Sequence, residues 1–160
     1  MKTTWIPLQS LPLAVSLVSR WVRAREREAL TRGQPLSPSQ LEDARSAGVA
    51  RPEHVRLLRV KNIPLFSNPL LKPAAFVGGA FFAGTAGLTV RYGILVRSDW
   101  WGDRRLLVHE LAHVAQYERL GGIRPFLRVY LQECITAGYP LGALEQEAIG
   151  VAAEICRTGS

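Results

Sequence analysis

Residues 106–115 read LLVHELAHVA and place two histidines and a glutamate in an apolar run. In an α-helix with about 100° per residue, His113 lies about 40° from His109 and one turn further along, so both imidazoles reach the same point. Glu110 lies about 100° from His109, beside that point. The apolar neighbours predict a buried helix, and burying three such polar side chains is costly unless they bind a partner.

The pattern His-Glu-x-x-His predicts a zinc site. Neutral imidazole is a good zinc ligand, and a carboxylate beside the metal can take a proton from the attacking water. Two of the three histidines in the chain lie in this pattern. We therefore expect Zn²⁺ to be held by His109 and His113, with Glu110 as the catalytic base.

A catalytic zinc usually has three protein ligands, so a third ligand is expected. Residues 143–148 read ALEQEA and offer two carboxylates on a helix that would return antiparallel to the first. Glu145 shares a face with the small residue Ala148, whereas Glu147 lies on the more polar side of the helix. We expect Glu145 to be the ligand. Glu147 is the alternative, and a third reading makes both carboxylates solvated helix charges.

Three further features carry open expectations. Tyr139, in a Gly-Tyr-Pro turn six residues before Glu145, is expected to donate to the oxyanion or to be a packed turn tyrosine. Gln116 lies about 60° from His113, where it could order a histidine or the substrate, or serve as a helix-packing amide. Trp100 and Trp101 could cap the core or form the rim of the cleft.

Apolar spacing, caps and breakers predict the remaining elements. We expect helices at about 11–30, 38–48, 103–120, 124–137 and 141–157, and strands at about 75–80 and 88–96. Residues 55–60 fit a strand or a helix end, and the proline-rich residues 62–73 fit an irregular connection. These elements predict an α+β fold.

The formal net charge of +7 is uneven along the chain. Residues 1–62 hold eleven Lys or Arg against five Asp or Glu, whereas residues 63–160 hold nine against eight. A basic segment of this kind could dock an acidic protein partner or form a solvated helix face. No nucleic acid is expected as a partner, because aromatic residues are not interleaved with the basic ones.

Neither a cleaved leader nor a membrane span is expected. The apolar residues 11–18 lack a small-residue cleavage site and fit an amphipathic helix. The charge-free run at 74–90 contains four glycines, which suit strands joined by turns better than a spanning helix. Cys134 and Cys156 fit no metal or disulfide framework, although one bridge between the last two helices stays open, and they favour the cytoplasm.

Three stretches together carry a resemblance to a known family. They are HELAHVAQYERLGG at 109–122, FLRVYL at 126–131 and GYPLGALEQEA at 138–148. The chain resembles the gluzincin branch of HExxH zinc metallopeptidases, in particular the small zinc-peptidase domain associated with bacterial contractile injection systems. In that group a glycine-containing strand precedes the helix, as residues 87–94 do here, and a downstream Glu-x-x-Ala supplies the third ligand, as Glu145 would.

The resemblance implies a zincin-like fold, with a small mixed sheet, a buried HExxH helix and a C-terminal return helix that carries Glu145. It also implies a peptide or protein substrate that adds in extended form along residues 89–95 at the sheet edge. The resemblance covers about residues 86–152, and residues 1–73 resemble nothing we can name.

We expect a single domain over 1–160, with a basic helical segment at 1–62 and the sheet plus HExxH core at 63–160. Fold alone does not fix function. The alternative to a peptidase is therefore a non-catalytic binding or scaffold module of the same fold, which docks an acidic protein through its Arg-rich N-terminal helices.

Overall fold

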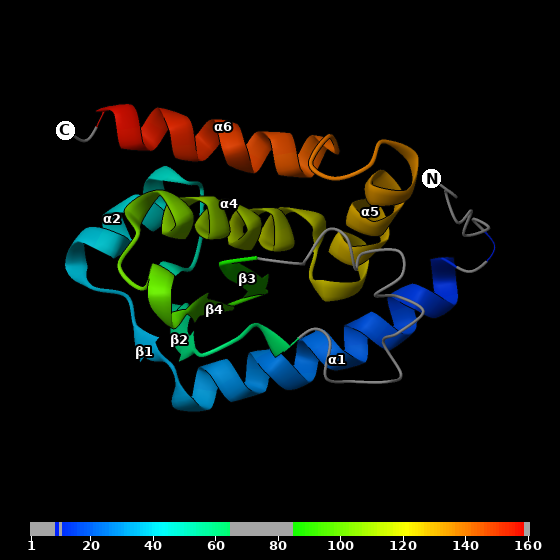
Figure 1. The fold of residues 1–160 in the computed structure, drawn as a ribbon, viewed down its shortest axis with the longest axis horizontal. Helices are drawn as coiled ribbons and strands as arrows, with labels where there is room; N and C mark the ends of the chain where they lie inside the picture. Colours follow the sequence, from blue (N-terminus) through cyan, green and yellow to red (C-terminus); the bar gives the residue numbers. More distant parts are fainter. Residues whose placement is uncertain (1–8, 10, 65–84, 159–160) are drawn as a thin grey trace.

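The computed structural model, which describes residues 9, 11–64 and 85–158, places a small sheet between a long N-terminal helix and a group of three C-terminal helices (Figure 1). The helices among these residues are α1 (Leu11–Arg32), α2 (Pro38–Ser46), α4 (Arg104–Leu120), α5 (Ile123–Thr136) and α6 (Ala143–Thr158). The strands are β1 (Gln34–Pro35), β2 (Arg56–Val60), β3 (Gly87–Val90) and β4 (Gly93–Arg97), and single 3-10 turns lie at Pro52–His54 and Ser98–Trp100. The fold is α+β, as expected.

Side-chain caps begin α2 and α4, and a glycine ends α4. Ser37 caps α2 in a capping box, and the carboxylate of Asp103 caps α4 by accepting a 2.7 Å hydrogen bond from the Leu106 amide. Gly121, with φ 95°, ends α4 in the left-handed region that favours glycine. Gly122, with φ 119°, is already the N-cap of α5. The chain therefore turns from α4 into α5 within two glycines.

The four described strands form one mixed sheet in the order β1-β2-β4-β3. β2 and β4 are parallel neighbours at the centre, with Leu58 opposite Leu95. β1 pairs antiparallel with β2, and β3 pairs antiparallel with β4. Of the described strands, β3 therefore lies at one edge of the sheet.

The single strand expected at 88–96 is wrong, because this segment is a hairpin. β3 ends at Val90 and β4 begins at Gly93, with Arg91 at φ 64° in the turn. Arg91 and Tyr92 are not the Asn-Gly or Asp-Gly pair typical of such turns, so the run resembles one strand. The strand expected at 75–80 and most of the irregular connection lie outside the described residues.

The sheet is covered on both faces, so its central strands are buried on both sides. Ile94 and Val96 of β4 lie in an apolar cluster with Leu111 of α4, whereas Leu95 between them joins a second cluster with α1 and α5. α1 lies across one face and α4 across the other, with α6 packed on α4 and antiparallel to it (Figure 1). The HExxH helix is therefore enclosed between the sheet and α6.

The basic N-terminal segment belongs to the same sheet. β1 and β2 both lie within residues 1–62, so the expected boundary at residue 62 does not separate the helical segment from the sheet. On the outer side of α1, Glu28 pairs with Arg25 at 2.8 Å and with Arg32 at 2.6 Å. Part of the arginine charge is thus already paired within the helix.

The structure also bears on two further expectations, one about membrane-spanning helices and one about the two cysteines. Among the described residues, no helix combines the length and apolar character needed to cross a membrane. Cys134 in α5 and Cys156 in α6 are both free, so the bridge that the sequence left open is not formed.

Candidate metal centre

Successive turns of α4 and the first turn of α6 bring three metal-ligating side chains together. Nε2 of His109 lies 3.2 Å from Nε2 of His113. The carboxylate of Glu145 faces both rings, with Oε1 3.0 Å from Nε2 of His109 and Oε2 3.4 Å from Nε2 of His113. One ligand atom from each residue lies within 4.8 Å of the others. The three expected ligand residues therefore converge.

The donor set fits a divalent metal such as zinc. Tetrahedral ligands at about 2.0–2.1 Å from zinc lie roughly 3.3 Å from one another. The two Nε2 atoms are 3.2 Å apart, a separation close to that edge length, and each faces a different oxygen of Glu145, Oε1 at 3.0 Å from His109 and Oε2 at 3.4 Å from His113. Two imidazoles and one carboxylate also form a ligand set found in zinc hydrolases, which keep a fourth position for water.

Burial and charge couple these groups. His113 is 7% exposed and Glu145 is 4% exposed. Burial alone would lower the pKa of His113 and raise the pKa of Glu145, because each charged form loses water. The hydrogen bonds between imidazole and carboxylate and their opposite charges outweigh burial, so the pKa of His113 is raised and that of Glu145 is well below its usual range. Glu145 therefore stays ionised, which suits a ligand.

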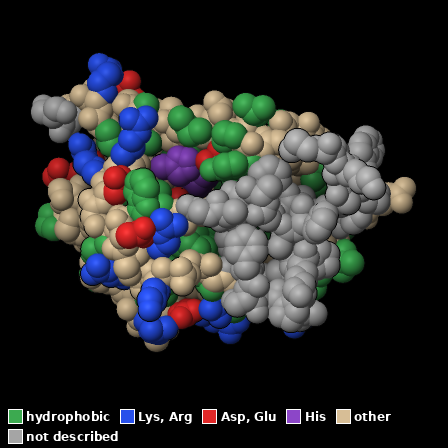
Figure 2. Space-filling view, viewed as in Figure 1, with side chains coloured by type: hydrophobic (Ala, Val, Ile, Leu, Met, Phe, Trp, Pro, Cys, Tyr) green, Lys and Arg blue, Asp and Glu red, His purple; other side chains and the backbone are tan. Residues whose placement is uncertain are grey.

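The cluster can be reached from the surface. The side chain of His109 is 20% exposed, in contrast to the buried His113. Figure 2 shows histidine side chains at this face of the molecule, next to acidic and hydrophobic side chains. A substrate can therefore approach from the side of His109.

Gln116 is fully buried and orders His113. Its Oε1 lies 2.8 Å from Nδ1 of His113, and its Nε2 donates a 2.8 Å hydrogen bond to the carbonyl of Leu144. Because the amide carbonyl can only accept, Nδ1 must carry the proton, and Nε2 is left to face the other ligands. Of the two roles considered from the sequence, Gln116 fills both, since the same amide also packs α4 against α6.

Glu147 forms an ion pair with Arg119 on the surface of the helices. Its carboxylate pairs with Arg119 through two bonds, Nη1 to Oε1 at 2.8 Å and Nη2 to Oε2 at 2.7 Å. The Arg119 guanidinium is the main cause that lowers the pKa of Glu147, and Gln116 adds a weaker hydrogen bond. The geometry therefore favours Glu145 over Glu147 as the third ligand.

Glu110 lies beside the cluster on the side of the sheet. It is 5% exposed, and its Oε2 accepts a 2.7 Å hydrogen bond from the hydroxyl of Thr89 in β3. The charge of Glu110 contributes to the raised pKa of both His113 and Tyr139. Sequence reasoning missed Thr89, although a threonine between apolar strand residues near Gly87 was an available signal.

Two tyrosines lie around Glu145. Tyr130 of α5 donates a 3.1 Å hydrogen bond to Oε2 of Glu145, and its ring lies edge-on to His113 with centroids 6.0 Å apart. Tyr139 is 42% exposed; burial, the charges of Glu145 and Glu110 and a hydrogen bond to Glu145 raise its pKa to about 12. The sequence pointed to Tyr139 but not to Tyr130, which lies four residues after Phe126 and stacks on it.

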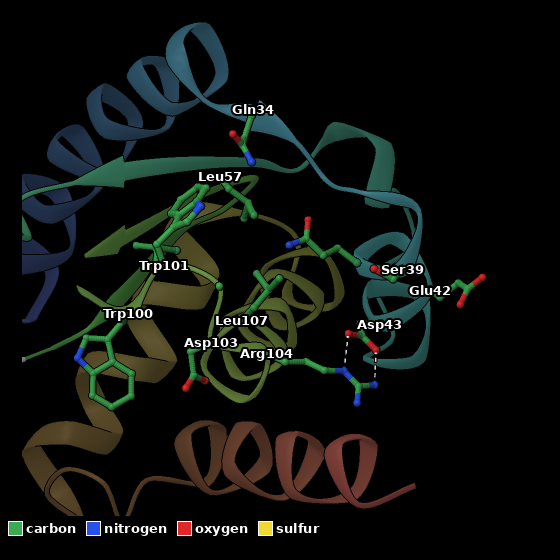
Figure 3. Close-up of a pocket in the computed structure, with 13 residues that line it drawn as sticks. Gln34, Ser39, Glu42, Asp43, Leu57, Trp100, Trp101, Asp103, Arg104 and Leu107 are labelled. Atoms are coloured by element: carbon green, nitrogen blue, oxygen red, sulfur yellow. Dashed lines mark hydrogen bonds and ion pairs between the residues drawn. The ribbon is translucent and has the colours of Figure 1, made fainter. Parts of the chain in front are cut away.

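The two tryptophans border a different cavity. It has a volume of about 520 Å³ and lies at the start of α4, with Trp100, Trp101 and Leu107 in its lining. Figure 3 shows the Arg104–Asp43 ion pair on one side of it, with bonds of 3.0 and 2.9 Å. None of the three metal-ligating residues lines this cavity. Trp100 and Trp101 therefore border a cavity that His109, His113 and Glu145 do not line.

The chain matches no protein-family model, no curated protein and no solved structure.

Proposed function

We propose that this protein is a zinc-dependent metallopeptidase with a zincin-like fold. His109, His113 and Glu145 hold the metal, and Glu110 is the general base. The observation that carries the proposal is the convergence of two imidazoles and a carboxylate, with one ligand atom of each within 4.8 Å of the others, and with a second buried carboxylate, Glu110, beside them.

The roles follow from the chemistry of the side chains. When bound, zinc supplies Lewis-acid chemistry, since it acidifies water and polarises a carbonyl. The carboxylate of Glu110 takes a proton from the attacking water and passes it to the leaving amine. Thr89 holds Oε2 of this carboxylate, so that Oε1 can face the water.

Tyr139 stabilises the negative charge that develops on the scissile carbonyl oxygen. Its pKa of about 12 keeps the phenol protonated at neutral pH, so it can donate a hydrogen bond. Its partial exposure suits a group that meets the substrate and not only the protein.

The substrate is a peptide or protein bound in extended form. β3 is an edge strand among the described residues, and its Thr89 touches the proposed base. A peptide that pairs with this edge gains main-chain hydrogen bonds and lies next to Glu110.

The test is a Glu110→Gln variant assayed on a peptide library. We expect it to bind zinc as the wild type does and to lose cleavage by roughly 10²-fold or more, because the amide cannot take a proton. Glu154→Gln, which changes an exposed glutamate of α6, is the control and should cleave normally. Equal cleavage by wild type and Glu110→Gln would remove the peptidase proposal.

A further inference from the structure

We infer that the exposed Arg119–Glu147 ion pair tunes the metal affinity of the histidine–glutamate cluster, acting through Gln116. This inference rests on the metal site of the proposed function and not on peptide cleavage. The three residues act as positioning residues, since none of them is a metal ligand.

The first step is the orientation of the Gln116 amide. The side chain is 0% exposed, so both ends of the amide need protein partners. The carbonyl end meets Nδ1 of His113, while the NH₂ end donates to the Leu144 carbonyl at 2.8 Å and to Oε2 of Glu147 at 3.2 Å. A flipped amide would set its oxygen against a carbonyl and a carboxylate. The two acceptors therefore fix which end faces the histidine.

The second step is the position of Glu147. Its carboxylate is 40% exposed and would be free to swing into solvent on its own. Arg119 donates two hydrogen bonds of 2.7 and 2.8 Å to this carboxylate. This bidentate pairing restricts the orientation of the carboxylate. An exposed pair of this kind contributes little to stability. Its effect is to keep Oε2 of Glu147 against the Gln116 amide.

The third step links this chain of contacts to the ligands. Gln116 bonds to His113 at one end and to the backbone of Leu144, the residue before Glu145, at the other. One amide thus fixes the tautomer of one ligand and its distance from the helix turn that carries another. If the Glu147 carboxylate becomes mobile, the Gln116 amide loses one of its acceptors. The orientation of the His113 ring is then less restricted.

The experiment measures zinc affinity of the full chain by competition with a chromogenic chelator. Loss of a contact that orients a ligand typically weakens metal binding about 10- to 100-fold, and we expect this range for Gln116→Met. For Glu147→Gln and Arg119→Met we expect a smaller loss of about fivefold each. The double variant should lose little more than either single one, because both changes release the same amide.

The matched control is Glu154→Gln, which breaks the exposed pair with Arg157 on the same helix and should leave zinc affinity unchanged. A second readout uses ¹⁵N NMR of the histidine rings after removal of metal by a chelator, at a pH high enough for the His113 ring to be neutral. We expect protonated Nδ1 at His113 in the wild type and a mixture of tautomers in Gln116→Met. This signal does not depend on cleavage or on zinc.

Affinities within twofold of wild type for Glu147→Gln and Arg119→Met would overturn the inference, as would an unchanged His113 tautomer in Gln116→Met. Absence of zinc binding by the wild type would overturn both the inference and the proposed function. Normal zinc binding with the expected affinity losses but no cleavage would support the inference and remove only the peptidase proposal.

Discussion

The hydroxyl of Thr89 in β3 lies 2.7 Å from Oε2 of Glu110 and 2.9 Å from the carbonyl oxygen of the same residue in α4. The edge strand therefore holds both the backbone and the side chain of the proposed base. Glu110 cannot reorient without breaking a contact between the sheet and the helix.

Thr89→Val is expected to lower kcat by about fivefold while zinc affinity stays unchanged. Valine keeps the shape of threonine but removes the donor, so the Glu110 carboxylate loses the bond that orients it, worth about 1 kcal/mol. Steady-state kinetics with a zinc titration checks this. Thr89→Ser keeps the hydroxyl and should retain most of the activity; a Val variant as active as the Ser variant would show that the bond is not needed.

Gly87→Ala should impair catalysis more than Thr89→Val does. A Cβ at this position would lie 2.8 Å from Oε1 of Glu110 and 3.0 Å from its Cγ, so the carboxylate has to move. A shift of this kind in a catalytic group can cost about 10²-fold in rate. The readout is kcat at saturating zinc.

The control for Gly87→Ala is Gly150→Ala in α6, where nothing lies within 4 Å of the added Cβ. Alanine in a helix should stabilise the protein by about 0.5–1 kcal/mol and leave kcat unchanged. Equal kinetics for both alanine variants would argue against a tightly held base.

Replacing each of the two tyrosines near Glu145 with phenylalanine should have a different effect on catalysis and on zinc binding. Tyr139→Phe removes the proposed oxyanion donor together with its hydrogen bond to Glu145, and should lower kcat by on the order of tenfold or more even at saturating zinc. Tyr130→Phe removes the 3.1 Å bond to Glu145 and should weaken zinc binding several-fold, with kcat restored by excess zinc. The opposite pattern would reassign both roles.

Zinc should raise the thermal stability of the wild-type protein. A ligand at 100 times its Kd stabilises the folded state by about 2.7 kcal/mol, which corresponds to roughly 5–10 °C in Tm for a chain of this size. Glu145→Gln should lose most of this gain, because an uncharged amide is a poor zinc ligand. Differential scanning calorimetry with and without zinc measures it, and an equal gain in both proteins would exclude Glu145 as a ligand.

Glu26 of α1 should make stability depend on pH. Burial raises its pKa above the usual 4.5, although the Tyr92 amide and the charges of Arg91 and Arg23 oppose this. Because the pKa of Glu26 is higher in the folded than in the unfolded protein, folding is favoured when this carboxyl is protonated. This contribution to stability is complete below the unfolded-state pKa and is lost as the pH rises through the folded-state pKa. Glu26→Gln should therefore increase the free energy of unfolding at pH 7 to 8 by about 1 kcal/mol, which raises Tm by a few degrees. The increase should be smaller at pH 4.

The control for this prediction is Glu28→Gln, two residues further along α1, where the side chain is 27% exposed and not buried as Glu26 is. It breaks the pairs with Arg25 and Arg32 and should lower Tm slightly at neutral pH. If Glu26→Gln shifted Tm equally at pH 4 and pH 8, the buried carboxyl would not be the cause.

Local signals were enough to predict α4 and its neighbours. Asp103 and Gly121 mark its ends, and the spacing of His109 and His113 determines that their rings share one side. The choice of Glu145 over Glu147 could also be argued from the polarity of the two faces of α6. Each of these inferences depends on residues within one helix.

The remaining features depend on contacts between distant segments. The pairing of β2 with β4 and the hairpin at Arg91 are set by the packing of α1 and α4 on the sheet, and no local turn signal marks them. Thr89 and Tyr130 reach the cluster only because β3 and α5 fold back onto α4. One sequence alone does not show which segments that are far apart in the chain lie close together in space.

The glycine pair between α4 and α5 has a consequence for mutational tolerance. Gly121 and Gly122 are far from crowded, since nothing lies within 4 Å of a Cβ added at either one. Both nevertheless have φ values that side chains of L-residues disfavour, 95° and 119°. A saturation scan should therefore find two adjacent positions on open surface that accept almost no replacement, because the sign of a backbone angle, and not lack of space, selects the residue.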